Sequence, residues 1–195
     1  IGSYNGIPLR VIPQSAGGGY FMNYHGRRQA TATRRIFYTY LDAAGTVVNN
    51  NEITSVQNHE GYASIAVDPV SGKPMHAWHA DADDESAYYE VQFTSDAFIA
   101  GIAGLFNDVQ IAVDNPTTIT TPSGQTTSDN EFIWPTLQVG PSPVAGKRRV
   151  YMVQRNSTTS HGTAGPSENP YFIYADFDGD DIENGVPFVW NHTTI

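Results

Sequence analysis

A strand–turn–strand pattern occurs twice in this chain. One copy begins with residues 62–69 (YASIAVDP) and the other with residues 134–141 (WPTLQVGP). In each copy an aromatic residue comes first, a small hydroxyl residue third, and aliphatic residues fourth and sixth. A turn with Pro and Gly follows, then Lys73 or Lys147, and then a second strand pattern. Repeated units of this kind predict an array in which neighbouring units bury one another's faces.

The composition favours short strands joined by many turns. Charged residues make up only 15 % of the chain, whereas it contains 18 Gly and 12 Pro. An aromatic content of 12 % is too high for a disordered chain. We therefore predict an all-β fold: a β-propeller-like array of three- to four-stranded antiparallel blades. About three blades are visible, which predicts an incomplete propeller, because propellers usually have about four or more.

We treat residues 1–195 as a single propeller-like region. Its expected parts are an N-terminal lead-in (1–18), a blade-like unit (19–58), repeat copy one (59–113), a Thr/Pro-rich loop without secondary structure (114–130) and repeat copy two (131–195). Aromatic and β-branched enrichment predicts the strands. They are an edge strand at 7–13, then 20–25, 35–41, a return strand that begins at 46–48, 62–67, 74–80, 88–93, 134–139, 149–154 and 170–175, with 188–190 as a fourth strand of copy two. Residues 97–106 are the one place where a short helix fits. The repeat-opening rings, Tyr62 and Trp134, are expected in the core.

Charge and cysteine content restrict the partners and the location. The net charge of −10 disfavours nucleic acid and anionic lipid surfaces, both of which repel an acidic protein. No apolar run is long enough to span a bilayer. The chain has no Cys and begins at Ile1 without a basic-then-apolar leader. A reducing compartment is compatible with this composition, but we expect a processed, secreted protein.

Residues 61–79 (GYASIAVDPVSGKPMHAWH) resemble the blade repeats of secreted bacterial β-propeller proteins, in the sialidase-like group and among Bacteroidetes-type secreted proteins. The resemblance implies a propeller fold and secretion. The chain departs from the sialidase pattern because it has no Asp-box turn (S-x-D-x-G-x-x-W). Sialidase-like enzymes also use three arginines, with Tyr and Glu as the catalytic pair. In this chain Arg27-Arg28, Arg34-Arg35 and Arg148-Arg149 would have to supply the arginines, although adjacent residues of a strand face opposite sides.

An acidic run near the C-terminus is the candidate metal site. Asp176, Asp178, Asp180 and Asn184 fall at positions 1, 3, 5 and 9 of a loop, and Ca²⁺ prefers six to eight such oxygen ligands. The run resembles the D-x-D-x-D-G-x-x-D calcium loops of secreted repeat proteins, with Asp181 at the usual Gly and Asn184 at the final Asp. The alternative is an acidic turn that follows a strand. We predict Ca²⁺ as the one cofactor.

Other groups of residues are weaker candidates for a functional site. Strand alternation places His76 and His79 on opposite faces, so they cannot hold one zinc ion together. Nothing in the spacing selects a catalytic pair among 20 acidic residues, and neither a G-x-S-x-G motif nor a Cys nucleophile is present. The sequence therefore favours a secreted binding or structural module, rather than an enzyme, whose rim loops meet an extracellular protein or a glycan. The alternatives are a fragment of a sialidase-like glycoside hydrolase and a subunit that completes its propeller with another chain.

Overall fold

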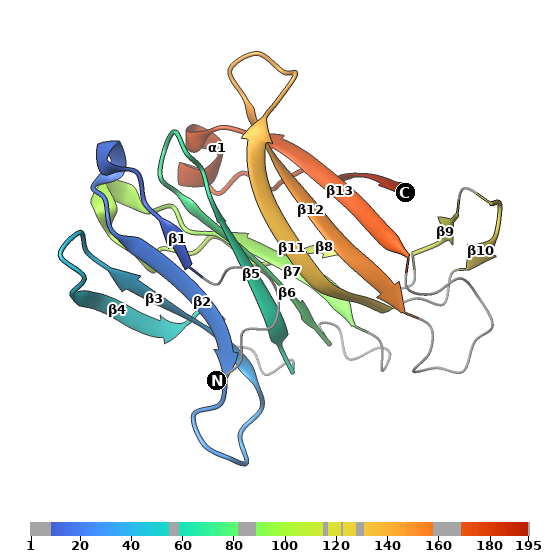
Figure 1. Cartoon of the computed structure of the whole chain (residues 1–195), viewed down its shortest axis with the longest axis horizontal. Coiled ribbons are helices and arrows are strands. Elements are labelled where there is room, and N and C mark those ends of the chain that lie inside the picture. The colour runs from blue at the N-terminus through green and yellow to red at the C-terminus, as the bar shows by residue number, and fades with distance from the viewer. Residues whose placement is uncertain are drawn as a thin grey trace.

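The computed structural model describes residues 9–54, 59–81, 89–114, 117–121, 123–127, 131–157 and 169–194. The fold is all-β. The described chain forms three antiparallel sheets of four strands, each with its strands in sequence order (Figure 1). This arrangement confirms the predicted class, a propeller-like array of antiparallel blades.

We name the sheets I, II and III in chain order. Sheet I contains β1 (Leu9–Val11), β2 (Tyr20–Gly26), β3 (Arg35–Leu41) and β4 (Val47–Glu52). Sheet II contains β5 (Gly61–Val67), β6 (Pro74–Ala80), β7 (Glu90–Ser95) and β8 (Gln110–Val113). Sheet III contains β11 (Glu131–Pro141), β12 (Arg148–Ser157), β13 (Pro170–Phe177) and β14 (Asn191–Thr194). The remaining elements are η1 (Gln14–Ala16), η2 (Ile99–Gly101), β9 (Ile119–Thr120), β10 (Thr126–Thr127) and α1 (Gly179–Glu183).

The sheets pack face to face, and sheet II lies between the other two. The leading face of a sheet is the one that points toward the sheet following it in chain order, and the trailing face is the opposite one. In the core between sheets I and II, the leading face of sheet I supplies Phe21, Ile36 and Tyr38, and the trailing face of sheet II supplies Ile65 and Trp78. Every residue of β6 and β7 is buried, because neighbouring sheets cover both faces.

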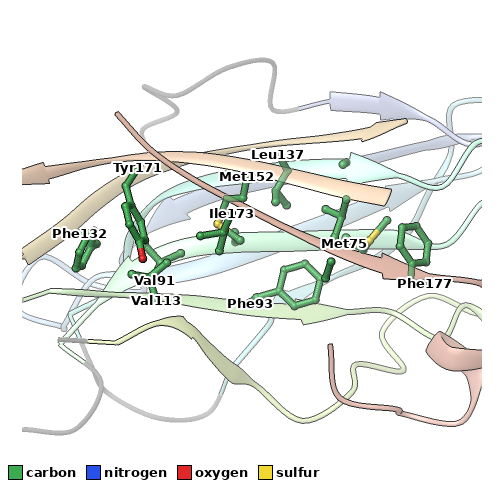
Figure 2. Packing of buried hydrophobic residues seen from close by; sticks show 14 of the residues in the cluster. Met75, Val91, Phe93, Val113, Phe132, Leu137, Met152, Tyr171, Ile173 and Phe177 are labelled. Carbon is green, nitrogen blue, oxygen red and sulfur yellow. The ribbon is translucent and has the colours of Figure 1, made fainter. Parts of the chain in front are cut away.

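The second core lies between sheets II and III. Figure 2 shows Met75, Val91 and Phe93 from the leading face of sheet II close to side chains of sheet III. The trailing face of sheet III contributes Leu137, Val150, Met152, Ile173 and Ala175. Burial of this apolar surface, at about 25 cal/mol per Å² removed from water, drives the sheets together.

The two segments that begin at Tyr62 and Trp134 share a backbone irregularity. The β5–β6 register shifts between Gly61 and Ser64, and the β11–β12 register shifts between Ile133 and Thr136. At each shift the aromatic residue has a positive φ, 54° at Tyr62 and 59° at Trp134. A left-handed backbone is rare for aromatic residues, and it marks a bulge that re-aims a side chain.

Several local expectations were wrong. The fourth strand of sheet III is β14 rather than residues 188–190. The described part of the 114–130 loop contains the hairpin β9–β10. Residues 97–106 form only one 3₁₀ turn, η2, because backbone amides of Phe98, Gly104 and Leu105 turn inward to donate to the buried Asp96 carboxylate.

Candidate functional site

The predicted calcium ligands lie around a short helix. Asp178 is the N-cap of α1, and its side chain accepts from the backbone N–H groups of Asp180 and Asp181. The Asp181 side chain accepts from the Asp178 backbone N–H, which completes a capping box. Asn184 is the C-cap, and its Nδ2 donates to the carbonyl of Asp180 at 2.8 Å. An Asp followed three residues later by a second acid is the sequence signal that predicts such a helix start.

Basic side chains engage most of these carboxylates. Arg149 donates to both oxygens of Asp176 at 2.8 and 2.7 Å, and this pairing lowers the pKa of Asp176. Lys147 Nζ lies 2.9 Å from Asp178 and 2.6 Å from Asp181. Within the described residues no three His, Asp or Glu side chains are grouped to hold a metal ion. Calcium binding at Asp176, Asp178, Asp180 and Asn184 stays a prediction.

The three arginine pairs do not converge. Arg34 and Arg35 lie at the start of β3, beside the first residues of β5, whereas Arg148 and Arg149 begin β12. β12 pairs antiparallel with β11, so its first residues lie beside the end of β11 and far from the residues that open it. Most of these guanidinium groups already have a carboxylate partner: Arg28 with Glu52, Arg35 with Glu60, Arg148 with Asp68 and Arg149 with Asp176.

Histidine and aromatic rings gather where β5 and β11 begin, and this group is the strongest candidate site. We name it the strand-start cluster: His25, His59, Tyr62, His79, Tyr89 and Trp134. The ring centroid of Tyr62 lies 4.9 Å from that of His79 and 5.7 Å from that of Trp134. Tyr89 stacks on His79 at 4.8 Å. The cluster therefore joins all three sheets.

Two histidines hold the bulged aromatic residues in place. His25 Nδ1 accepts the backbone N–H of Tyr62 at 3.0 Å, and His79 Nδ1 accepts that of Trp134 at 3.4 Å. In each case a histidine near the end of the second strand of one sheet fixes the residue that opens the next sheet. A ring nitrogen that accepts a hydrogen bond leaves the proton on Nε2, so both imidazoles are neutral there.

Burial keeps these histidines uncharged. It lowers the pKa of His25 to about 4, with a further contribution from Arg34, and the pKa of His79 to about 3. His76 is different, because it faces sheet I, where its Nδ1 lies 3.2 Å from Asn23 Nδ2. The expectation that His76 and His79 point to opposite faces is therefore confirmed.

Two guanidinium groups lie over the rings of Trp134 and Tyr62. The guanidinium carbon of Arg155 is 3.9 Å from the centroid of the Trp134 ring, and that of Arg34 is 5.4 Å from the Tyr62 ring. Arg34 also donates to the Glu60 carbonyl at 2.6 Å. A cation over a ring face is attracted by the ring quadrupole. The cluster thus combines apolar rings, neutral imidazoles and positive charge in a chain whose net charge is −10.

The expected core position of the two repeat-opening rings was wrong. Trp134 is 38 % exposed and Tyr62 is half-buried. Alternation along a strand predicts an inward ring, but the positive φ at the register shift interrupts this alternation and re-aims the side chain. The sequence contains no direct signal for this turn, although an aromatic at the same place in both copies marks the position.

A hollow of about 480 Å³ lies away from the cluster, at the turns that follow β1, β5 and β7. Its lining includes Ser71, Lys73, Phe98 and Glu183. Lys73 is 4 % exposed, and its Nζ donates to the Ala97 carbonyl and to Glu183 at 2.8 Å. Because protein groups already engage this buried cation, the hollow is a weaker candidate than the strand-start cluster.

Comparisons with family models, curated proteins and solved structures give no match to this chain. Among the described residues, no helix has the length and apolar character needed to cross a membrane. The function must therefore be argued from the strand-start cluster itself.

Proposed function

We propose that this protein is a secreted binding module that holds a glycan at the strand-start cluster. The main support for the proposal is the exposure of Trp134 on a backbone that the protein holds in place. Its ring is 38 % exposed, its backbone is left-handed at φ 59°, and the His79 imidazole accepts its N–H. Left-handed conformations of non-Gly residues cost about 1–3 kcal/mol and concentrate at functional sites.

The chemistry of the cluster suits a sugar. Aromatic rings offer a flat apolar surface with little conformational entropy to lose, and the C–H faces of a pyranose can stack on it. Arg34 and Arg155 supply N–H donors for hydroxyl or carboxylate groups. Tyr62 lies 5.7 Å from Trp134, which offers a second ring beside the first.

The rival hydrolase has less support. Its arginines would have to meet at one place, but Arg148 and Arg149 lie at the opposite strand end from the two pairs in the connection between β2 and β3. The buried carboxylate of Glu60, just before β5, is 1 % exposed and is occupied by Arg35, Thr54 and the backbone N–H of Ile36. Burial raises the pKa of Glu60, but its oxygens face into the protein rather than toward the rings. Binding without catalysis is therefore the better interpretation.

The Trp134→Ala variant tests the proposal. We expect wild type to bind one class of oligosaccharide in a panel of immobilised neutral and acidic glycans, and Trp134→Ala to bind it at least about ten-fold more weakly, about 1.4 kcal/mol. Val144→Ala is the control, because Val144 is 48 % exposed but lies in the turn between β11 and β12, at the opposite end of β11 from Trp134. Absence of glycan binding by wild type, or equal losses in both variants, contradicts the proposal.

Binding should not depend on pH near neutrality. His25 and His79 have pKa values of about 4 and about 3, so both imidazoles stay neutral well below pH 6. We expect the dissociation constant for the glycan found above to be constant from about pH 8 to about pH 5.5. Calorimetric titration measures it directly. A change with a midpoint near 6.5, the usual histidine value, that persists in the His59→Gln variant would show that the imidazoles of His25 and His79 are not held as described.

A further inference from the structure

The array has two outer sheet faces, and they are of the same two kinds that pack together at each internal junction. Inside the chain, leading faces pack on trailing faces twice, I on II and II on III. The leading face of sheet III and the trailing face of sheet I have no neighbouring sheet within the described residues. From these two faces we infer that two copies of this chain close head to tail into a ring of six sheets.

The leading face of sheet III corresponds in register to the buried leading face of sheet II. In sheet II, Ser64, Ala77 and Phe93 pair across β5, β6 and β7. In sheet III, Thr136, Val153 and Phe172 pair in the same way across β11, β12 and β13. Ala77 and Phe93 are covered by sheet III, with 0 % and 1 % exposure, whereas Val153 is 39 % exposed.

Aromatic side chains continue this outer face of sheet III. Tyr151 stacks on Phe172 at 5.9 Å, and Tyr174 lies 6.0 Å from Phe172. Arg149 lies over Tyr174 at 4.1 Å. A sheet face that combines several aromatic rings with an arginine is typical of an interface rather than of solvated surface.

The trailing face of sheet I also exposes apolar side chains. Val11 is 63 % exposed, Leu9 37 % and Tyr20 38 %. Farther along the same face, Tyr24 stacks on Phe37 at 5.8 Å with an interplanar angle of 7°. This face occupies the position that Leu137, Met152 and Ile173 hold in sheet III, where sheet II covers them.

The internal junctions indicate which strands would meet between copies. At the junction of sheets II and III, β6 contacts β11, the first strand of the next sheet. By the same geometry β12 of one copy would contact β1 of the other, which places Val153 against the face of β1 that carries Leu9 and Val11. Each copy has one uncovered leading face and one uncovered trailing face, so two copies can cover all of these faces without a third component. Head-to-tail contacts of this kind close into rings, and six sheets lie within the four to eight of known propellers.

The first test is the mass in solution. Light scattering on the purified 195-residue chain, in about 150 mM salt to screen its negative charge, should give twice 21.3 kDa. A mass of 21.3 kDa at high micromolar concentration would overturn the inference. A mass that keeps rising with concentration would overturn it too, since it would show an open filament rather than a ring.

Charge variants test the head-to-tail geometry. Val153→Glu and Val11→Lys should each give a monomer, because either change breaks both junctions of the ring. An equimolar mixture should recover a dimer with one unaltered junction and one Lys–Glu junction, which also shows that both variants are folded. Val189→Glu is the control, since Val189 is 77 % exposed and lies outside both faces.

Two outcomes of the mixing experiment would reject the geometry. If Val11→Lys stays dimeric while Val153→Glu does not, sheet III pairs with itself and the ring is wrong. If the mixture stays monomeric although circular dichroism shows both variants folded, the two faces do not meet.

Discussion

Replacing Trp78 by Ala is expected to lower the free energy of unfolding by about 3–5 kcal/mol, the usual cost of removing a large buried ring. Trp78 is fully buried in β6, in the core between sheets I and II. Its indole Nε1 donates to Gln92 Oε1 at 2.8 Å, so the change also leaves a buried acceptor without this donor. For a domain of this size the loss corresponds to a fall in Tm of roughly 6–20 °C.

Urea unfolding followed by circular dichroism measures the effect. Trp134→Ala is the matched control, because it removes the same side chain from a 38 % exposed position, and it should cost less than about 1 kcal/mol. Trp78→Phe keeps most of the volume and should lie between the two. Equal destabilisation by Trp78→Ala and Trp134→Ala would contradict the assignment of Trp78 to the core.

The second large effect is expected at Asp68, which joins sheets II and III. This carboxylate is fully buried at the end of β5 and accepts from Arg148 Nε at 2.9 Å and Nη2 at 2.5 Å. It also accepts from the backbone N–H groups of Val70 and Ser71 at 3.2 and 3.1 Å, and from the Ser71 hydroxyl. Asp68→Asn keeps the size but removes the charge that Arg148 needs. We expect a loss of about 3–5 kcal/mol, typical of a buried ion pair that loses one partner.

The effect of Asp68→Asn should depend on pH. Burial opposes ionisation of Asp68, but the hydrogen bonds from Arg148 and Ser71 outweigh it and lower its pKa. A carboxyl with a lower pKa in the folded state stabilises the fold fully above its unfolded pKa of about 3.9, and this contribution is lost as the pH falls through the folded value. The difference in unfolding free energy between wild type and variant should therefore shrink at acid pH.

Urea titrations between about pH 6 and pH 3 measure this difference. Comparison with the variant is necessary because burial raises the pKa of Glu60 and of Asp96, which changes stability with pH in the opposite direction. Asp108→Asn, at an exposed position, is the control and should follow wild type. A wild type–variant difference that is constant across this range would show that Asp68 does not ionise as described.

Strand positions followed from the sequence because their causes are local. The run 35–41 predicted β3, and its bounds are those observed, since aromatic and β-branched residues fit a pleated strand and the Asp42 turn ends it. The turn at residues 68–73 was also predicted correctly. By contrast, α1 was missed within the predicted calcium loop, because acidic spacing suits both a cation loop and a helix N-cap.

The sequence by itself therefore determined the all-β class, most strands and the opposite orientations of His76 and His79, which all depend on neighbours along the chain. The tertiary structure alone decided which ring stays exposed and which cation engages each carboxylate. Trp134 turns outward because His79, far away in sequence, accepts its backbone N–H. Asp176 is held by Arg149, from the neighbouring strand β12. Such pairings arise only when strands that are distant in the sequence come together, so no local pattern encodes them.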